Sequence, residues 1–203
     1  MADNRLPEPA RLAACLSTDE HRVMRDHLSR ARVLLEFGIG GSTGLAAEYD
    51  LEHQFGVDSH PDWIAHCLRD PRIAEKHAQG RVSLHRVDIG PVGDWGIPTD
   101  PSCARRWPAY SLDIWSRLEG REPDFVFVDG RFRLSCALQA LLRLPFLPVL
   151  GFHDFWDRPH YHTVLEFTDV VERTGQLVIL TPKRDMDLRA LAIAASATLI
   201  DSR

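Results

Sequence analysis

A run of apolar residues that ends in a glycine-rich turn constrains the fold of this chain more than any other part of its sequence. Residues 31–36 are predicted to form a strand, and three glycines come soon after it: Gly38, Gly40 and Gly41. Glycine lets the backbone turn sharply and lets another group approach where a Cβ atom would collide. Residues 42–49 then have the composition of a helix. A strand, a glycine turn and a helix in this order predict the first unit of an α/β fold that binds a ligand at the turn.

Strands and helices alternate along most of the remaining sequence. The strands are expected at residues 31–36, 53–57, 81–87, 124–128, 146–152, 176–180 and 188–195. The helices are expected near residues 17–28, 42–49, 131–143 and 163–171, with one more that starts at Pro61. Alternation at this spacing predicts a three-layer α/β protein with a seven-stranded, mostly parallel sheet and helices on both faces. Because the last two strands lie close together in the sequence, we expect them to form an antiparallel C-terminal edge.

The length and composition fit one globular domain. The chain has 203 residues, of which 44% are hydrophobic and 26% are charged, so a wholly disordered chain is excluded. Within this single domain we expect a helical N-terminal segment at residues 1–30 and an irregular, aromatic-rich insertion at residues 89–122. The formal net charge of −5 opposes binding to nucleic acid or to an anionic membrane, because both attract basic proteins.

The cysteines and the apolar stretches indicate a protein of the cytoplasm. The four cysteines are Cys15, Cys67, Cys103 and Cys136. They lie far apart and form no CxxC pair, which disfavours a zinc ribbon, a redox motif or a disulfide scaffold. The N-terminal sequence has no basic segment followed by an apolar run, so no secretory signal is expected. The longest apolar stretches, residues 144–152 and 190–200, are too short to cross a bilayer.

The insertion combines residues that break regular structure with large aromatic side chains. The aromatic residues are Trp95, Trp107, Tyr110 and Trp115. Its prolines and glycines oppose a long helix or strand, and a flexible linker would lack so much aromatic surface. We therefore expect an ordered loop in which residues 91–108 close over an acceptor molecule. Packing of the aromatic side chains against the edge of the sheet is the alternative.

Two acids lie where a ligand at the glycine turn would meet them. Asp58 comes after the second expected strand, 20 residues after Gly38, at the position of an acid that accepts hydrogen bonds from ribose hydroxyls. Glu36 precedes the turn, and its carboxylate would repel the phosphates of a dinucleotide. It suits a ligand with a positive charge and no phosphate. A dinucleotide-binding turn also reads GxGxxG, whereas Thr43 takes the last position here, so an NAD-dependent oxidoreductase is disfavoured.

The sequence of the turn, Glu36-Phe-Gly38-Ile-Gly40, resembles motif I, (E/D)xGxG, of the class I S-adenosylmethionine-dependent methyltransferases. The resemblance implies that Gly38 and Gly40 contact the amino-acid part of the cofactor. Glu36, Gly41 and Ser42 belong to the same cofactor-binding turn in this comparison, and Ser42 stands where the pattern often has a third glycine.

The resemblance continues at the ends of the second and third expected strands. Asp58 matches the acid that binds the ribose of S-adenosylmethionine, and Asp88 matches the acidic position beside the adenine. In element order the match covers residues 30–200. It implies a Rossmann-like fold, S-adenosylmethionine as the cofactor, and methyl transfer to an oxygen or nitrogen atom of a small acceptor.

The ends of the fourth and fifth expected strands are similar to those of small-molecule O-methyltransferases, including catechol-type and sugar enzymes. Many of these enzymes place a metal-binding Asp after the fourth strand and an Asp-Asn or His-Asp pair after the fifth. Asp129, His153 and Asp154 fall on these positions, which implies catalytic roles for all three and a Mg²⁺ or Mn²⁺ ion on Asp129 and Asp154. The chain departs from the pattern at residues 145–148, which lack a Gly-Gly turn, and after Gly130, where the sugar enzymes commonly have a His.

Two carboxylates at neighbouring strand ends repel each other unless a positive charge or a proton compensates them. A divalent cation could bridge Asp129 and Asp154 and hold two oxygen atoms of the substrate. A proton shared between the carboxylates would also reduce the repulsion. Arg131 and Arg133 could neutralise the acids, or they could hold an anionic substrate by forked hydrogen bonds. The sequence leaves these alternatives open.

Each candidate residue also has a structural interpretation without a ligand. The glycines could serve only a tight turn, Asp58 could cap the helix that comes after it, and Asp88 could form an ordinary turn. Asp129 could cap the next predicted helix. His153 and Asp154 could form a hydrogen-bonded strand end without a metal.

Two further function classes stand beside an active methyltransferase. The first is a methyltransferase-like protein that binds the cofactor or a partner without turnover, and the second is the disfavoured NAD-dependent oxidoreductase. An enzyme requires that Asp129, His153 and Asp154 face the cofactor with room for an acceptor. We expect a small-molecule acceptor, sugar-like or anionic, and neither nucleic acid nor membrane as partner. The sequence leaves the identity of the acceptor and the oligomeric state open.

Overall fold

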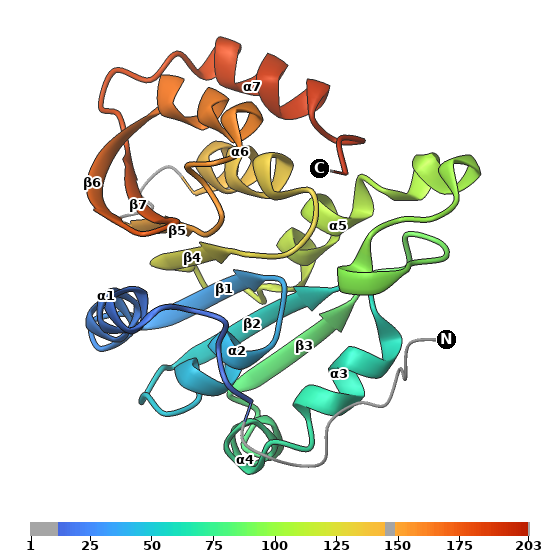
Figure 1. The fold of residues 1–203 in the computed structure, drawn as a ribbon, viewed down its shortest axis with the longest axis vertical. Coiled ribbons are helices and arrows are strands. Elements are labelled where there is room, and N and C mark those ends of the chain that lie inside the picture. The colour runs from blue at the N-terminus through green and yellow to red at the C-terminus, as the bar shows by residue number, and fades with distance from the viewer. Residues whose placement is uncertain (1–11, 145–148, 203) are drawn as a thin grey trace.

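The computed structural model describes residues 12–144 and 149–202 and has a seven-stranded sheet with helices on both faces (Figure 1). The strands are β1 (Val33–Phe37), β2 (His53–Asp58), β3 (Val82–Arg86), β4 (Phe125–Val128), β5 (Val149–Phe152), β6 (Thr168–Thr174) and β7 (Leu177–Pro182). Their order in the sheet is β3-β2-β1-β4-β5-β7-β6. Neighbours among β1 to β5 pair in parallel, and β7 runs antiparallel to both β5 and β6. The predicted three-layer Rossmann-like fold is confirmed.

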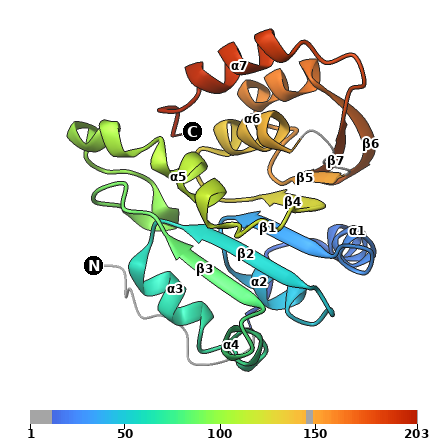
Figure 2. The same ribbon diagram turned by 180° about the vertical axis from the view of Figure 1, so that it is seen from behind.

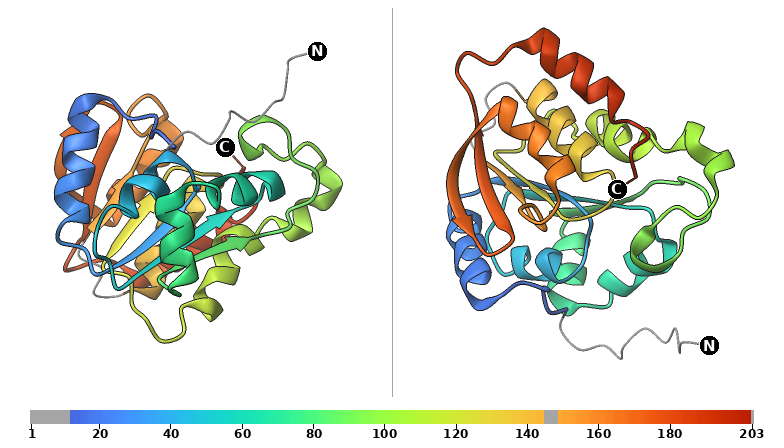
Figure 3. Two further views of the ribbon diagram at one scale, coloured as in Figure 1. Left: turned by 90° about the horizontal axis from the view of Figure 1, so that it is seen from below. Right: turned by 45° about the horizontal axis from the view of Figure 1, so that its top comes forward.

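Seven α-helices flank the sheet in the described residues. They are α1 (Thr18–Leu28), α2 (Gly41–Ala46), α3 (Pro61–Cys67), α4 (Pro71–Ala78), α5 (Ala109–Leu112), α6 (Arg133–Arg143) and α7 (Leu188–Ala197). Helices α1 to α4 pack on one face of the sheet, and α5 to α7 pack on the other (Figure 3). None of the described helices is long and apolar enough to cross a bilayer.

The alternation of side chains along β1 places its residues on the two faces. Val33, Leu35 and Phe37 join the core beneath α5 to α7, whereas Leu34 packs with α1 and α2. Every residue of β1 and of β4 is buried, as expected for parallel strands covered on both sides. Glu36 shares the face of Leu34, and this alternation directs its carboxyl group toward α2.

Two predictions near the C-terminus are wrong. Residues 188–195, predicted as a strand, form helix α7, whose first turn is capped by the Asp187 carboxylate. Residues 163–171, predicted as a helix, contain the end of a 3-10 helix, η4 (Pro159–Glu166), and the start of β6. The sequence of β6 is rich in β-branched Thr and Val, which favour strands over helices.

The other predicted helices and strands are observed where they were predicted, and one observed helix was not predicted. Helix α4 is not among the expected helices, although Asp70 caps it and Pro71 takes its first position. The expected N-terminal helix is α1, and residues 1–11 lie outside the described part of the chain. The predicted fifth strand is observed at Val149–Phe152, and residues 145–148 are likewise outside the described part.

The insertion at residues 89–122 is built from short helices, and β3 runs directly into it (Figure 2). It contains η1 (Asp94–Gly96), η2 (Pro101–Arg106), α5 and η3 (Asp113–Arg117). Tyr110 is fully buried, and Trp107 and Trp115 pack against the same core. Trp95 is instead 84% exposed and has a φ of 58°, a conformation that bulky residues avoid. Packing against the sheet thus accounts for three of the four aromatic residues, and Trp95 is left facing solvent.

Candidate functional site

The candidate residues lie at or just after the ends of strands that finish at the same edge of the sheet. Phe37, at the end of β1, pairs with Val57 of β2 and with Val128 of β4. Val128 in turn pairs with Phe152 of β5. The residues that come next form a row along this edge: Gly38, Asp58, Asp129 and His153. In a parallel sheet this edge is where ligands bind.

The glycines of the turn are required by close contacts within the chain. Gly38 has a φ of 92°, and a Cβ atom on it would overlap the backbone of Gly130, which lies just after β4. A Cβ atom on Gly41 would overlap the backbone of Ala13. Gly40 lies beside the ring of Trp63, whose Nε1 donates a hydrogen bond to the Ile39 carbonyl oxygen. The turn is therefore fixed from three sides, by the loop after β4, by the N-terminal segment and by α3.

Glu36 lies inside the turn and holds it together. Its side chain is fully buried and accepts hydrogen bonds from the hydroxyls of Ser42 and Thr43, the latter at 2.6 Å. The Thr43 hydroxyl also accepts a 2.8 Å hydrogen bond from the backbone N–H of Gly40. Burial, with a smaller contribution from the nearby Asp129 carboxylate, outweighs the hydroxyl hydrogen bonds and raises the pKa of Glu36 to about 7. The structure thus assigns Glu36 and Ser42 to the shape of the turn.

Asp58 lies beside the turn and does not cap a helix. Its carboxylate accepts hydrogen bonds from the backbone N–H of Ile39, at 3.3 Å, and of His60, at 2.8 Å. The N-cap of α3 is His60, which makes no side-chain capping bond, so the capping interpretation of Asp58 is wrong. Burial raises the pKa of Asp58 despite these hydrogen bonds. Asp58 therefore connects the end of β2 to the glycine turn, and its contacts with the described residues leave part of its hydrogen-bonding capacity unused.

Asp88 forms a turn at the start of the insertion. Its carboxylate accepts a 3.0 Å hydrogen bond from the Gly90 backbone N–H and pairs with Arg106 at 3.1 Å. The side chain is 63% exposed. The turn interpretation accounts for these contacts, and a cofactor role for Asp88 stays a prediction.

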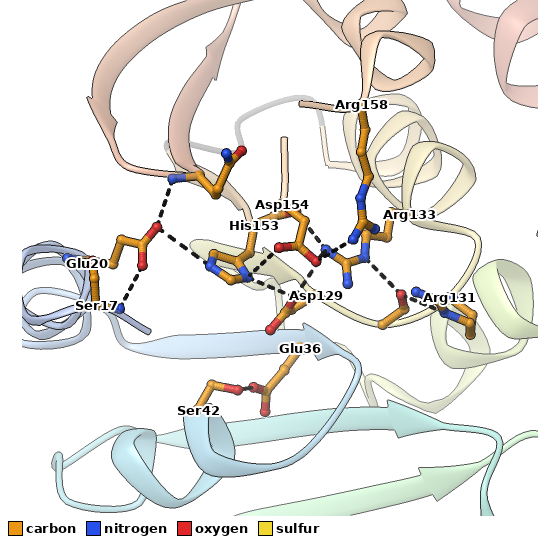
Figure 4. A network of polar contacts seen from close by, with 12 residues as sticks. Ser17, Glu20, Glu36, Ser42, Asp129, Arg131, Arg133, His153, Asp154 and Arg158 are labelled. Carbon is orange, nitrogen blue, oxygen red and sulfur yellow. Dashed lines mark hydrogen bonds and ion pairs between the residues drawn. The ribbon is translucent and has the colours of Figure 1, made fainter. Parts of the chain in front are cut away.

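Asp129 and Asp154 are both paired with Arg133 (Figure 4). The Nη1 atom of Arg133 is 3.1 Å from Asp129 Oδ1 and 3.1 Å from Asp154 Oδ2. It also donates a 2.7 Å hydrogen bond to the carbonyl oxygen of His153, while Nε donates to that of Gly130 at 2.9 Å. The sequence left three ways to compensate the charges of the two acids: a divalent cation, a shared proton or an arginine. The structure shows an arginine that contacts both acids.

The backbone around this arginine adopts rare conformations. Phe132, the N-cap of α6, has a φ of 52°, and Asp154 has a φ of 54°. Since Phe132 is the N-cap of α6, the interpretation of Asp129 as the cap of this helix is wrong. A left-handed φ is strongly disfavoured for a buried phenylalanine, and such strain concentrates at functional sites. The bend at Phe132 allows the Arg133 side chain to fold back between the ends of β4 and β5.

His153 lies between acids and faces away from solvent. Its Nδ1 atom is 3.1 Å from Asp129 Oδ1, and its Nε2 atom is 3.6 Å from Glu20 Oε1 on α1. Burial alone would lower the pKa of His153, but the hydrogen bond and charge of Asp129, with Asp154 and Glu20, raise it. Glu20 also accepts hydrogen bonds from the backbone N–H groups of Ser17 and Gln176. The His153 ring thus lies between Glu20 and Asp129 and holds the Asp129 carboxylate in position.

Arg131 differs from Arg133 in its ion pairs. Within residues 12–144 and 149–202 it forms no ion pair, and its Nε donates a 3.1 Å hydrogen bond to the carbonyl oxygen of Gly130. Burial lowers the pKa of Arg131, and the positive charges of Arg133 and Arg158 lower it further. Arg158 is itself paired with Asp154 at 2.9 Å. Arg131 is therefore a partly buried cation beside Gly130 that has no counter-charge among the described residues.

Three residues of this edge were not predicted. Glu20 carries a sequence signal only as the acid of a capping box with Ser17, a role that it also has in the structure. Trp63 and Arg158 carry no signal, because their contacts depend on how α3 and the segment after β5 fold back onto the edge.

Similar structures are known, although no protein-family model and no curated protein sequence matches this chain. A methyltransferase-like protein from Silicibacter pomeroyi DSS-3 is 30% identical over 95% of this chain and 99% of that one, with a TM-score of 0.81. The O-methyltransferase from Bacillus cereus, solved with S-adenosylhomocysteine, is 14% identical over 88% and 84% of the two chains, with a TM-score of 0.52. A putative caffeoyl-CoA O-methyltransferase from Staphylococcus aureus is 13% identical over 84% and 86%, with a TM-score of 0.54. The last two show the shared fold.

Replacing Glu36 with Gln should make the stability of the protein less dependent on pH. The pKa of Glu36 is raised from an ordinary 4.5 to about 7 in the folded chain, so between these values the folded chain holds more protons than the unfolded one. The free energy of unfolding therefore falls as the pH rises through this window, by about 1–3 kcal/mol from this group. Urea unfolding between about pH 5 and pH 8 should show Glu36→Gln gaining stability relative to the wild type as the pH rises.

The exposed Glu122 supplies the control for this comparison. The difference between Glu122→Gln and the wild type should stay constant over the same pH range. A constant difference for Glu36→Gln as well would contradict the raised pKa.

Proposed function

This chain belongs to the class I S-adenosylmethionine-dependent methyltransferases, and we propose that it transfers the cofactor's methyl group to an oxygen or nitrogen atom of a small acceptor at the carboxyl ends of β1, β2, β4 and β5. The observation that carries the proposal is the Asp58 carboxylate, which lies beside the glycine turn without an ion-pair partner in the described chain.

Asp58, the last residue of β2, and the two residues after it fit the ribose of the cofactor. A partly buried carboxylate is stabilised by further hydrogen-bond donors, and two adjacent ribose hydroxyls would supply them to Asp58. Ser59 Oγ and His60 Nδ1 are also buried there, and no described residue gives either atom a hydrogen bond. Buried polar atoms normally have partners, so these atoms support a polar ligand at this position.

The charges at the turn favour a cationic ligand over a dinucleotide. Glu36 and Asp129 lie close enough for the Asp129 charge to raise the pKa of Glu36. The Asp129 carboxylate would repel phosphate groups beside the turn, whereas it would attract a positively charged sulfur. These charges support S-adenosylmethionine over NAD.

Asp129 is the residue that we assign to proton removal. When bound, S-adenosylmethionine supplies an electrophilic methyl group on a sulfonium. The chain then has to align the acceptor and take up its proton. Asp129 Oδ1 faces His153 and Arg133, while Oδ2 has no hydrogen bond from any described residue. Oδ2 receives the proton of the acceptor, His153 positions the carboxylate, and Asp154 borders the acceptor.

A divalent metal does not fit these residues, because the Arg133 guanidinium already lies between Asp129 and Asp154. We therefore assign no step to a metal. The same contacts favour a second candidate function, a protein that binds the cofactor without turnover, since the ion pairs restrain both acids. Turnover with any acceptor decides between the two.

We assign the acceptor to the anionic class, on the evidence of Arg131. This arginine is partly buried beside Gly130, close to the end of β4, and in the described part of the chain it forms no ion pair. A cation in that position is stabilised by an anionic ligand, and the planar guanidinium matches a carboxylate or phosphate group through two parallel hydrogen bonds. Arg133 already forms ion pairs with Asp129 and Asp154, so the two arginines have different roles.

Replacing Asp58 with Ala should weaken binding of S-adenosylhomocysteine by about 1–3 kcal/mol, or roughly 5- to 150-fold, because the ribose hydroxyls lose a charged acceptor. Isothermal titration calorimetry measures this change, with NAD titrated in parallel and expected not to bind. Asp62→Ala is the matched control, because Asp62 is exposed on α3 close to Asp58. Equal affinity in wild type and Asp58→Ala would contradict the cofactor assignment.

Replacing Asp129 with Asn should abolish methyl transfer and leave the affinity for S-adenosylhomocysteine nearly unchanged. Loss of a general base lowers the rate by about 100-fold or more. Release of S-adenosylhomocysteine, measured by mass spectrometry with a panel of phenols, hydroxy acids and sugar phosphates, tests this. Asp169→Asn, exposed on β6, should keep the wild-type rate. Cofactor binding without turnover on the whole panel would instead support the second candidate function.

Phenylglyoxal, which modifies accessible guanidinium groups, should label Arg131, and inorganic phosphate should slow this labelling several-fold. Peptide mass spectrometry identifies the modified residue. The exposed Arg22 is the control, and phosphate should leave its labelling unchanged. Equal labelling of Arg131 with and without phosphate would contradict the anion site. Protection by S-adenosylhomocysteine, but not by 5′-methylthioadenosine, would assign Arg131 to the cofactor's carboxylate and contradict the acceptor assignment.

A further inference from the structure

The guanidinium group of Arg133 lies where a cation between Asp129 and Asp154 would lie (Figure 4). Its Nη1 atom is 3.1 Å from one oxygen of each carboxylate and 2.7 Å from the carbonyl oxygen of His153. Three oxygen atoms from two neighbouring strand ends thus converge on a single nitrogen atom. The arrangement is that of a cation held by oxygen ligands.

The side chains around this nitrogen are also a suitable set of metal ligands. Asp129, His153 and Asp154 each offer one ligand atom, and these atoms lie within 4.8 Å of one another. A divalent ion with bonds of about 2.0 to 2.6 Å to oxygen can bridge atoms at this spacing. With Arg133 in place, the ion would have to share the carboxylates with a positive charge a few ångströms away, which is strongly unfavourable. Arg133 and a metal ion therefore exclude each other.

Arg133 is fixed in this position by the fold. Its side chain is 6% exposed, and its Nε bonds to the Gly130 carbonyl oxygen at 2.9 Å. The left-handed backbone of Phe132 directs the first turn of α6 toward the acids. An exposed arginine could swing away to admit an ion, but this one would give up all of its hydrogen bonds and both of its ion pairs, at a high cost for a buried charge.

We propose that the guanidinium of Arg133 replaces the divalent cation at this site, so that the protein works without a metal, and that removal of this one charge turns Asp129, His153 and Asp154 into a metal-binding site. The inference rests on the proposed function for its place beside the acceptor. Metal binding is measured without an acceptor, so its outcome is separate from that of the turnover experiments.

Titration with Mn²⁺, monitored by electron paramagnetic resonance, tests the proposal on the full-length protein. Mn²⁺ is a suitable probe because it accepts carboxylate ligands. The wild type should bind no Mn²⁺ at the site up to millimolar concentrations. Arg133→Met, which keeps a long side chain without its charge, should bind one Mn²⁺ ion at least about 10-fold more tightly than the wild type. Added Mn²⁺ should also raise the Tm of Arg133→Met and not that of the wild type.

Three variants serve as controls. Arg133→Lys keeps a positive charge and should create no site. Arg158→Met removes the other arginine that pairs with Asp154, at 2.9 Å, and should create none either. The double variant Arg133→Met with Asp129→Asn should lose the Mn²⁺ bound by the single variant.

Two results would overturn the proposal. One is a wild-type protein that binds one Mn²⁺ ion which Asp129→Asn removes, because metal and arginine would then coexist. The other is a folded Arg133→Met protein, verified by circular dichroism, that binds Mn²⁺ no more tightly than the wild type. If Arg133→Met does not fold, Arg133→Gln is the second neutral variant, and the wild-type titration decides the first half of the proposal by itself.

Discussion

One buried arginine holds the ends of β4 and β5 together. Arg133 bonds to the carbonyl oxygens of Gly130 and His153 and pairs with the carboxylates of Asp129 and Asp154. Without the arginine the two acids would repel each other, and without the acids the buried guanidinium would lack compensation for its lost hydration. The position of each acid that we assign to the acceptor therefore depends on this side chain, and so does the exclusion of a metal.

The edge of the sheet has two electrostatically different parts. At the ends of β4 and β5 the carboxylates are matched by arginines and by His153, so charge is compensated within the chain. At the end of β2, the partners of Asp58 among the described residues are backbone N–H groups, which leaves capacity for a ligand's hydroxyl groups. The turn lies between these parts, and Glu36, with its pKa near 7, stabilises it from within. This division suits a cofactor bound through its ribose on one side and an acceptor with its proton on the other.

Local sequence pattern and parallel topology are enough to predict the parallel strands β1 to β5 and the row of residues at their edge. That row needs only the alternation of strands and helices, because parallel strands end at one edge. The prediction of a strand at residues 188–195 is wrong because a short apolar run does not distinguish a strand from a helix. Contacts between distant segments have no local signal, as for Glu20 on His153. Likewise, the sequence offers both Arg131 and Arg133 as partners for the acids, and the bend at Phe132 decides between them.

A crystal structure of the protein with S-adenosylhomocysteine tests the central claim most directly. We predict that the ribose hydroxyls bind Asp58, that the sulfur lies on the side of Asp129, and that Arg133 keeps its contacts with both Asp129 and Asp154. A ligand bound away from the glycine turn would contradict this claim, and so would an Arg133 side chain displaced by a metal ion between the two carboxylates.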